Sequence, residues 1–279
     1  MHFQIKLYTI ILISTLFFTA CSKDKKEIIE NARVSSKPAP KSLKLTLEKN
    51  SLNIETNTSL KVIATYQDNT TKDVTNQVEW IYTDKQALDI KNNILKTLHK
   101  DTNIFLQAKY KNKTSNKVAL EIYKEINGYK LPPMPDEDLN NATILGIDVN
   151  NNEVRDDVER WIFDKYKEPI VQAVALQNAR AFSKILVDPS KAKETIKFSD
   201  ALIECQSYYK YQSSKKVIQK GTSLIKESRP LILNTRKRNR AYYEYNQALS
   251  GGVYSLGDRD KYKDSCDFNE SKVQMGEWK

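Results

Sequence analysis

Apolar and polar residues alternate in five short runs of the chain, at residues 42–48, 60–66, 78–82, 104–110 and 118–123. A period of two is typical of strands that bury one face. Segments rich in Asn, Asp, Thr and Lys separate the runs, at the spacing of a two-sheet fold. We therefore predict an all-β sandwich for residues 42–125, with Trp80 packed between its sheets.

After residue 153 the apolar residues recur at steps of three and four. Val154, Val158 and Ile162 begin this pattern, and residues 170–186 continue it. Such spacing is typical of amphipathic helices. Three further helices are expected, near residues 196–209, 214–228 and 235–250. The chain is therefore predicted to be multidomain, with an all-α helical domain over residues 153–279 that ends in an irregular tail.

Two segments have the composition of connections rather than of folded domains. Residues 126–147 include Leu-Pro-Pro-Met-Pro, and prolines favour extended backbone. Residues 21–41 are dominated by Ser, Lys, Glu, Asn and Pro, which bury too little apolar surface to fold alone. We expect the first segment to be a linker and the second to be a flexible tether.

Residues 1–20 are predicted to be a signal peptide. Their apolar run, from Leu7 to Phe18, is too short to span a bilayer, and it leads into Phe18-Thr19-Ala20-Cys21. This tetrad resembles the lipobox of bacterial lipoproteins, although Leu is usual at the position of Phe18. The resemblance implies that Cys21 is acylated and anchors the chain in a membrane, and Ser22 implies the outer membrane if the source bacterium has two membranes. The alternative is an ordinary cleaved signal with a chance cysteine.

The order of residues in the predicted sandwich resembles the group 2 bacterial immunoglobulin-like family. The matching motifs are Leu45-Thr-Leu47, Thr65-Tyr66 with Asp68, Lys72-Asp-Val-Thr75 and Val78-Glu-Trp80. Residues 98–102 depart from the family, which often has a glycine there. The resemblance implies an immunoglobulin-like fold that acts as a spacer in a surface protein. In some members of the family such domains serve adhesion, by binding carbohydrate or host molecules.

Residues 148–159 have the ligand order of an EF-hand-like calcium loop with a helix leaving it, as in dockerin-type repeats. Oxygen-bearing side chains stand at loop positions one, three, five, nine and twelve, and a backbone carbonyl is expected at position seven. The candidate ligands are Asp148, Asn150, Asn152, Val154, Asp156 and Glu159. Three of them are carboxylates, which would neutralise Ca²⁺, an ion that prefers six to eight oxygen ligands. The loop is therefore predicted to hold a structural calcium ion.

Position six of this loop departs from the pattern, because Glu153 replaces the usual glycine. A residue with a side chain costs about 1–2 kcal/mol in the left-handed conformation required there. We therefore expect weak affinity for calcium, on the order of 0.1–1 mM. The alternative interpretation is an Asx-rich helix start without a metal, because Asp and Asn cap helices and acidic residues suit the first turn.

Apart from Cys21, the chain has two cysteines, Cys205 and Cys266. In an exported protein the default expectation is a disulfide between them, and two free thiols are the alternative. The apolar spacing around Cys205 directs it toward the core, so Cys266 is expected to hold the tail.

The net charge of +10 is spread along the chain, with one local excess. Residues 210–240 contain ten basic residues and one acidic residue, Glu227. The candidate contact surface within this excess comprises Arg236, Lys237, Arg238 and Arg240. Such a surface suits an envelope protein or an anionic glycan, and a solvated helix face is the alternative. Nucleic acid is not an expected partner, because no nucleic-acid-binding motif occurs.

Little in the sequence indicates an enzyme. The two histidines are His2 and His99, and neither a glycine-rich phosphate loop nor Gly-x-Ser-x-Gly occurs. We therefore expect a non-enzymatic, lipid-anchored envelope protein that acts as an interaction or structural module. The alternative is a glycan-processing lipoprotein that uses carboxylates of the helical domain.

Overall fold

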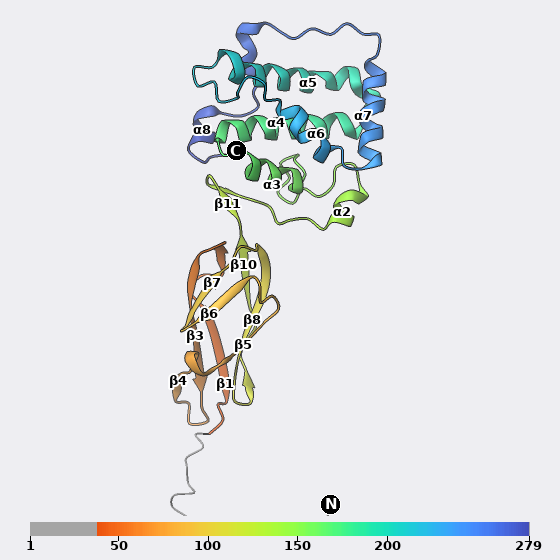
Figure 1. Ribbon diagram of the computed structural model, residues 1–279. Coiled ribbons are helices and arrows are strands. Elements are labelled where there is room, and N and C mark those ends of the chain that lie inside the picture. Colours follow the sequence, from red (N-terminus) through yellow and green to blue (C-terminus); the bar gives the residue numbers. More distant parts are fainter. Residues whose placement is uncertain (1–37, 279) are drawn as a thin grey trace, which may run out of the picture. The chain divides into compact units, whose positions relative to one another are not determined.

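The computed structural model describes residues 38–278, and the chain from Pro40 onward forms one compact unit. Strands occupy the chain from Ser42 to Lys130 and α-helices follow from Glu137 to Gln274, which confirms the predicted β part and α part (Figure 1). The predicted signal peptide, Cys21 and most of the tether lie outside the described residues. None of the helices within residues 38–278 is long and apolar enough to cross a membrane.

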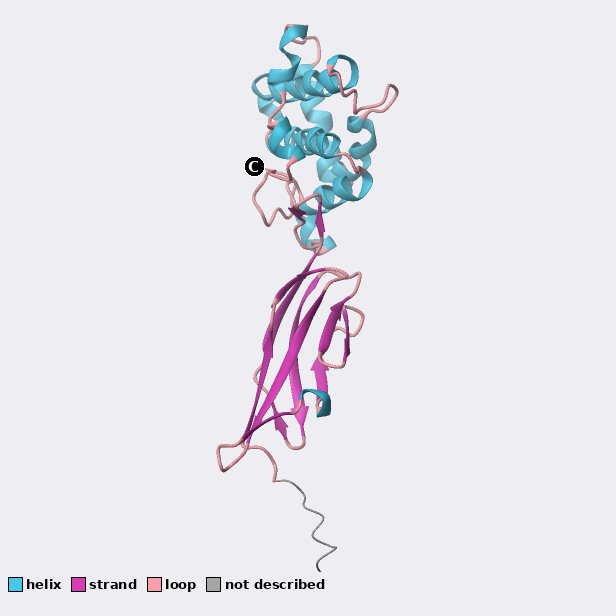
Figure 2. Ribbon diagram, turned by 90° about the vertical axis from the view of Figure 1, so that its left-hand side faces the viewer, coloured by secondary structure: helices cyan, strands magenta, loops and turns pink. Residues whose placement is uncertain are grey.

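Two five-stranded sheets make up most of the β part (Figure 2). The first sheet has the order β1-β3-β7-β6 with β4 beside β3, and the second has the order β2-β10-β8-β5 with β9 beside β8. Neighbouring strands are antiparallel except for β2 and β10, which are parallel. The bounds are β1 (Ser42–Leu47), β2 (Ser51–Asn53), β3 (Asn57–Thr65), β4 (Thr71–Asp73), β5 (Glu79–Tyr82), β6 (Leu88–Lys91), β7 (Ile94–Thr97), β8 (Thr102–Tyr110), β9 (Lys113–Thr114) and β10 (Val118–Tyr123), with a 3-10 turn η1 (Thr75–Gln77).

Alternate side chains of both sheets meet in one apolar core. In β1, Leu43 and Leu45 are buried while the residues between and beside them are exposed or half-buried. The rest of the core comes from the other strands in the same way, and includes Leu60, Val62, Ala64, Leu95, Ile104, Leu106, Leu120 and Ile122. Trp80 packs against this core but is only half-buried, so it does not fill the space between the sheets as expected.

The five predicted strands correspond to β1, β3, β5, β8 and β10. The other strands of the two sheets are two to four residues long. Strands of two to four residues are too short to be recognised from an alternation of apolar and polar residues. Their formation depends on pairing with the longer strands beside them.

The predicted linker, residues 126–147, is more structured than its prolines indicate. β11 (Glu125–Ile126) and β12 (Tyr129–Lys130) form a hairpin. Its turn residues, Asn127 and Gly128, have φ values of +52° and +74°. Two consecutive residues with positive φ are typical of a two-residue hairpin turn, and Asn-Gly is the strongest sequence signal for it.

The α part is built around α4. Fourteen of the 19 residues of α4 are buried, as expected of a helix that is apolar on most sides. α3, α5, α6, α7 and α8 all pack against it (Figure 1). The bounds are α2 (Glu137–Ala142), α3 (Asp156–Lys165), α4 (Pro169–Val187), α5 (Ala192–Ser207), α6 (Leu224–Ile232), α7 (Arg236–Leu249) and α8 (Glu270–Gln274), with short helical turns η2 (Pro189–Lys191), η3 (Tyr208–Gln212) and η4 (Arg259–Ser265).

The predicted helix over residues 214–228 is wrong. Residues 213–223 are irregular, and α6 begins only at Leu224. α6 then continues through Pro230, because Leu224, Ser228 and Ile232 are buried along one face and this packing outweighs the hydrogen bond that proline removes.

The tail after residue 252 was expected to be irregular, but it contains η4 and α8. A seven-residue turn and a five-residue helix carry too few apolar positions to be recognised by period.

Candidate functional site

The predicted calcium loop, residues 148–159, connects α2 to α3 and ends inside α3. Loop positions nine and twelve, Asp156 and Glu159, lie in the first turn of that helix. Acidic side chains suit a helix N-terminus because they interact favourably with the helix dipole. This arrangement is common to a calcium loop and to a helix start without a metal, and both interpretations must account for the environment of the two carboxylates.

The backbone of the loop is held in a tight turn by its own side chains. The Asp148 carboxylate accepts hydrogen bonds from the backbone N–H groups of Asn152 (3.1 Å) and Glu153 (2.8 Å). Asn151 and Glu153 both have positive φ, +56° and +66°. Glu153 therefore adopts the conformation for which glycine is usual at position six, at a cost of about 1–2 kcal/mol.

Asp156 and Glu159 are fully buried, and neither forms an ion pair with any residue that the structure describes. Burial is the main cause that raises the pKa of Asp156 to about 6; the hydrogen bond from Val149 opposes this rise, and the nearby carboxylate of Asp148 contributes to it. Burial also raises the pKa of Glu159 to about 7. At neutral pH Asp156 is therefore mostly ionised and Glu159 about half ionised, so this part of the loop has buried negative charge without an ion-pair partner among the described residues.

Neutral donors surround the Glu159 carboxylate. Tyr129 of β12 donates its hydroxyl to Oε1, and the side-chain amides of Asn152 (3.0 Å) and Asn150 (3.3 Å) also donate to it. Burial, followed by the Glu159 charge, raises the pKa of the Tyr129 hydroxyl. Tyr129 was missed in the sequence because it lies 30 residues before Glu159. The Asn-Gly turn of the hairpin is the one signal that could have brought it near the loop.

Asp156 is fixed by the backbone at the start of the loop. Its carboxylate accepts a hydrogen bond from Val149 N (3.1 Å), and its own N–H donates to the carbonyl of Ile147 (2.8 Å). Among the described residues no donor bonds the carbonyl oxygen of Val154, at position seven. This oxygen is therefore free of protein partners and available to a ligand.

The structure brings Asn150, Asn152 and Glu159 together, whereas Asp148 and Asp156 bind backbone N–H groups of the loop. Within residues 38–278, no group of three or more His, Cys, Asp and Glu side chains is gathered so as to hold a metal ion. Two of the candidate ligands are Asn and one is a backbone carbonyl, which are not residues of those four types. The donor set still fits calcium in chemistry and number, because all six members offer oxygen.

Arg155 fastens the loop to α6. Its guanidinium, 6% exposed, donates to the carbonyls of Leu231 (2.7 Å) and Ile232 (3.2 Å) and to the Asp157 carboxylate (3.0 Å). Gly146 lies against it with φ of +71°, and a Cβ atom there would approach Arg155 Cδ to 2.4 Å. The loop therefore depends on a close contact that only glycine permits.

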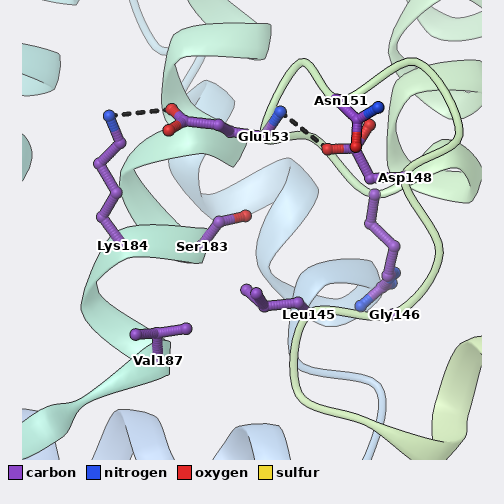
Figure 3. Close-up of a pocket in the computed structure, with 9 residues that line it drawn as sticks. Leu145, Gly146, Asp148, Asn151, Glu153, Ser183, Lys184 and Val187 are labelled. Atoms are coloured by element: carbon purple, nitrogen blue, oxygen red, sulfur yellow. Dashed lines mark hydrogen bonds and ion pairs between the residues drawn. The ribbon is translucent and has the colours of Figure 1, made fainter.

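A cavity of about 410 Å³ borders the loop on the side of α4 (Figure 3). Glu153 of the loop reaches across to Lys184 of α4, with 2.9 Å between the carboxylate oxygen and Nζ. Leu145 and Val187 form an apolar part of its wall. The ion pair thus joins the loop to α4 at the position where glycine was expected.

The remaining predicted site residues have different outcomes. Cys205 and Cys266 form a disulfide with 2.03 Å between the sulfur atoms, and Cys205 is fully buried. Arg236, Lys237 and Arg240 of α7 are exposed, as a contact surface requires. Arg240 is paired with Glu244 (2.8 Å), and Lys237 donates to the carbonyl of Ala142 (3.1 Å).

Arg238 does not belong to that surface, because its side chain is completely buried. Its guanidinium donates to the carbonyls of Asn140 (2.6 Å), Thr143 (3.1 Å) and Ile144 (2.8 Å) and to the side-chain oxygen of Asn141 (2.9 Å). Burial, followed by the charge of Arg155, lowers its pKa to about 10. Arg238 therefore joins α7 to the chain around α2, and the prediction that it is exposed was wrong.

Comparisons with known proteins give no family for this chain. No family model matches it, and no curated protein matches it. One solved structure that it resembles in part is the ZirS C-terminal domain, at 16% sequence identity, over 43% of this chain and 94% of that chain, with a TM-score of 0.20. A likeness at this TM-score carries no argument about fold or function.

Proposed function

We propose that this chain is a lipid-anchored, non-enzymatic protein of the bacterial cell envelope, in which a calcium ion stabilises the base of a helical interaction domain. The observation that carries the proposal is the pair of fully buried carboxylates, Asp156 and Glu159, which have no ion-pair partner among the described residues. Unpaired charge in a protein interior is strongly destabilising, and a bound dication removes that cost. The role of the ion is structural.

The residues that would hold the ion are those of the predicted ligand order: Asp148, Asn150, Asn152, Val154, Asp156 and Glu159. Calcium prefers hard oxygen donors in about this number. The side chains of Asn150 and Asn152 already lie beside Glu159, where their amide N–H groups donate to its carboxylate, so each amide would turn to present its oxygen to the ion. The Val154 carbonyl has no protein donor within the described part of the chain. Once bound, the ion would supply the positive charge for which Tyr129 and the two amides are weak substitutes.

An immunoglobulin-like identity of the β part is supported by its strand order. Sheets with the orders β1-β3-β7-β6 and β2-β10-β8-β5 correspond to the A-B-E-D and G-F-C arrangement of that fold, when β2 is taken as a second part of the first strand. A domain of this kind between the anchor and the α part is a spacer in our proposal, because nothing on it gathers site chemistry.

Attachment to a membrane rests on the sequence before residue 38. The lipobox-like Phe18-Thr19-Ala20-Cys21 supports export and acylation of Cys21, and the envelope location follows from it. In a bacterium with two membranes, Ser22 supports the outer one. The exposed Arg236, Lys237 and Arg240 are the proposed contact surface for an envelope protein or an anionic glycan.

Thermal unfolding with and without calcium tests the proposal. For a dissociation constant of 0.1–1 mM, about 10 mM Ca²⁺ should raise the free energy of unfolding by about 1.4–2.7 kcal/mol relative to EDTA. Asp148→Asn should remove most of this gain, because it takes one charge from the ligand set. The matched control, Asp138→Asn, changes an exposed Asp in the first turn of α2 and should keep the full response.

Equal melting temperatures in EDTA and in calcium would end the calcium part of the proposal. Release of soluble fragments from purified peptidoglycan or polysaccharide by the wild-type chain would contradict its non-enzymatic part and favour glycan processing.

A further inference from the structure

A second cavity, of about 290 Å³, lies among α4, α5, α6 and α7. It shares no lining residue with the candidate calcium loop. Most of its wall is apolar, and Phe182, Ile185, Ile196 and Leu249 all contribute to it. A concave apolar wall with a few polar groups is typical of small-molecule sites, and this cavity is near the lower limit of their size.

A basic group stands at the α6 side of this cavity. The guanidinium of Arg229 lies over the ring of Tyr242, 5.6 Å from its centroid. No carboxylate of the described residues forms an ion pair with Arg229, and its side chain donates no hydrogen bond there. Its planar set of N–H groups is therefore held by the aromatic ring and remains available to a carboxylate from outside.

An acidic group stands at the α5 side. The carboxylate of Asp200 forms neither an ion pair nor a hydrogen bond with any described residue. Burial, followed by the charge of Glu204, raises the pKa of this carboxyl group. Beside it, the Tyr245 hydroxyl and Ser199 Oγ are 3.3 Å apart and both line the cavity. This side thus offers one carboxylate and two hydroxyl groups.

Both charged groups border the same stretch of α7. Tyr242, under Arg229, and Tyr245, near Asp200, are three residues apart on one face of that helix, which is about 4.5 Å along its axis. Arg229 and Asp200 do not form an ion pair with each other. Arg229 is exposed and Asp200 is half-buried, and neither has an ion-pair partner among the described residues. An apolar cavity bordered by two such groups of opposite charge suits a small ligand that has both charges and an apolar substituent.

We propose that this cavity binds a free amino acid with an apolar side chain. Arg229 binds its carboxylate, and Asp200 with the hydroxyls of Ser199 and Tyr245 binds its ammonium group. The side chain enters the apolar part of the cavity, between Phe182 and Ile185. A fatty acid would leave Asp200 without a partner, and an alkylamine would leave Arg229 without one, so either should bind less tightly than the zwitterion.

Calorimetric titration of the full chain separates these ligands. L-Leucine and L-phenylalanine should bind. Isocaproate has the leucine skeleton without the amine, and isoamylamine has it without the carboxylate. Each should bind about tenfold more weakly or worse, because one charged hydrogen-bond partner is lost. Glycine, which has no side chain to bury, should bind weakly too. D-Leucine and the dipeptide Leu-Leu test whether one enantiomer and a free single residue are preferred.

Two variants with matched controls assign the charges. Arg229→Gln should weaken leucine binding by about tenfold or more and should leave isoamylamine binding unchanged. Asp200→Asn should weaken leucine binding similarly and should leave isocaproate binding unchanged. Arg259→Gln and Asp138→Asn, which make the same changes at exposed positions outside the cavity, should bind leucine as the wild type does.

Three results would overturn the inference. The first is that neither leucine nor phenylalanine binds at millimolar concentration. The second is that isocaproate binds as tightly as leucine. The third is that both charge variants bind leucine as tightly as the wild type does. Circular dichroism of each variant shows that a loss of binding does not reflect unfolding.

Discussion

Glu159 is the residue on which the candidate calcium site depends most. It is fully buried and stands at the last position of the ligand order. Its carboxylate accepts hydrogen bonds from the Tyr129 hydroxyl and from the side-chain amides of Asn150 and Asn152. Without a cation, the negative charge opposes folding because burial disfavours it. With a cation bound, the same carboxylate would serve as the ligand at loop position twelve.

Glu159→Gln should therefore act in opposite directions in two buffers. In EDTA we expect it to stabilise the fold by about 1–3 kcal/mol, because a neutral amide of the same size avoids the burial of charge. In calcium it should abolish the stabilisation by the ion. Chemical unfolding in each buffer measures both effects. Glu153→Gln, at the non-ligand position six, serves as the control and should keep the calcium response. Destabilisation by Glu159→Gln in EDTA would contradict the assignment of Glu159 as an uncompensated charge.

Arg238 lies in a basic segment of the sequence, but its side chain is buried and donates hydrogen bonds inside the α part. Its five N–H groups fan out to carbonyl and amide oxygens around α2, a geometry that a lysine cannot reproduce. It therefore has a structural role, whereas its neighbours Arg236 and Lys237 are exposed.

Arg238→Lys should destabilise the fold by about 3 kcal/mol or more, because several buried oxygens would lose their donors although the charge is kept. Urea unfolding at neutral pH measures the loss. Arg236→Lys, two residues earlier on the same helix and exposed, should change the free energy of unfolding by less than about 0.5 kcal/mol. Equal effects of the two substitutions would contradict the structural role of Arg238.

At the scale of elements, α8 is too short to be stable alone, and one acidic side chain at its start, Glu270, helps to hold it. Glu270 accepts hydrogen bonds from Lys215 Nζ (2.7 Å) and from the Tyr209 hydroxyl (3.1 Å). The hydrogen bond from Lys215 is the main cause that lowers the pKa of Glu270 below its ordinary value. The unfolded chain therefore protonates Glu270 at a higher pH than the folded chain does.

The stabilisation by Glu270 should be lost as the pH falls. It is fully present above the ordinary pKa of glutamate, near 4.5, and disappears as the pH drops through the lower pKa of the folded state. Glu270→Gln should lower the free energy of unfolding at neutral pH by about 1 kcal/mol or less, because the pair is partly exposed to solvent. Thermal unfolding over a pH series should show this difference shrinking in acid. Glu194→Gln, on the exposed part of α5, is the control. A difference that does not depend on pH would refute the ionic role of Glu270.

At the scale of the whole molecule, the disulfide joins the tail to the centre of the α part. Cys205 of α5 and Cys266, after η4, are 61 residues apart in sequence. A bond that closes so long a loop restricts the unfolded chain strongly, and through it the tail with α8 is kept against α4.

Replacement of both Cys205 and Cys266 by Ser should lower the free energy of unfolding by about 4 kcal/mol, from the length of the closed loop. Urea unfolding of the wild type, with and without a reducing agent, and of the double variant measures it. The reducing agent should affect the wild type and not the variant. A loss below about 1 kcal/mol would mean that the tail is held by packing alone.

Features encoded in local spacing were available from the sequence alone. Leu43 and Leu45 alternate with exposed neighbours along the chain itself, so β1 could be predicted without knowing which strand pairs with it. In the same way, apolar residues at steps of three and four predicted α3 and α4. The ligand order from Asp148 to Glu159 is local in the same sense, because it depends on twelve consecutive residues.

Other features depend on residues that are distant in sequence, and only the tertiary structure determined them. Arg238 is buried because carbonyls 94 to 98 residues away surround it, and Glu159 has its hydroxyl donor because a hairpin brings Tyr129 to it. Arg229 and Asp200 face one cavity because α5 and α6 both pack on α4. The sequence determines which residues are polar and how they are spaced along a strand or helix. The packing of the elements determines which of those polar groups meet a partner, because burial depends on neighbours that no local pattern specifies.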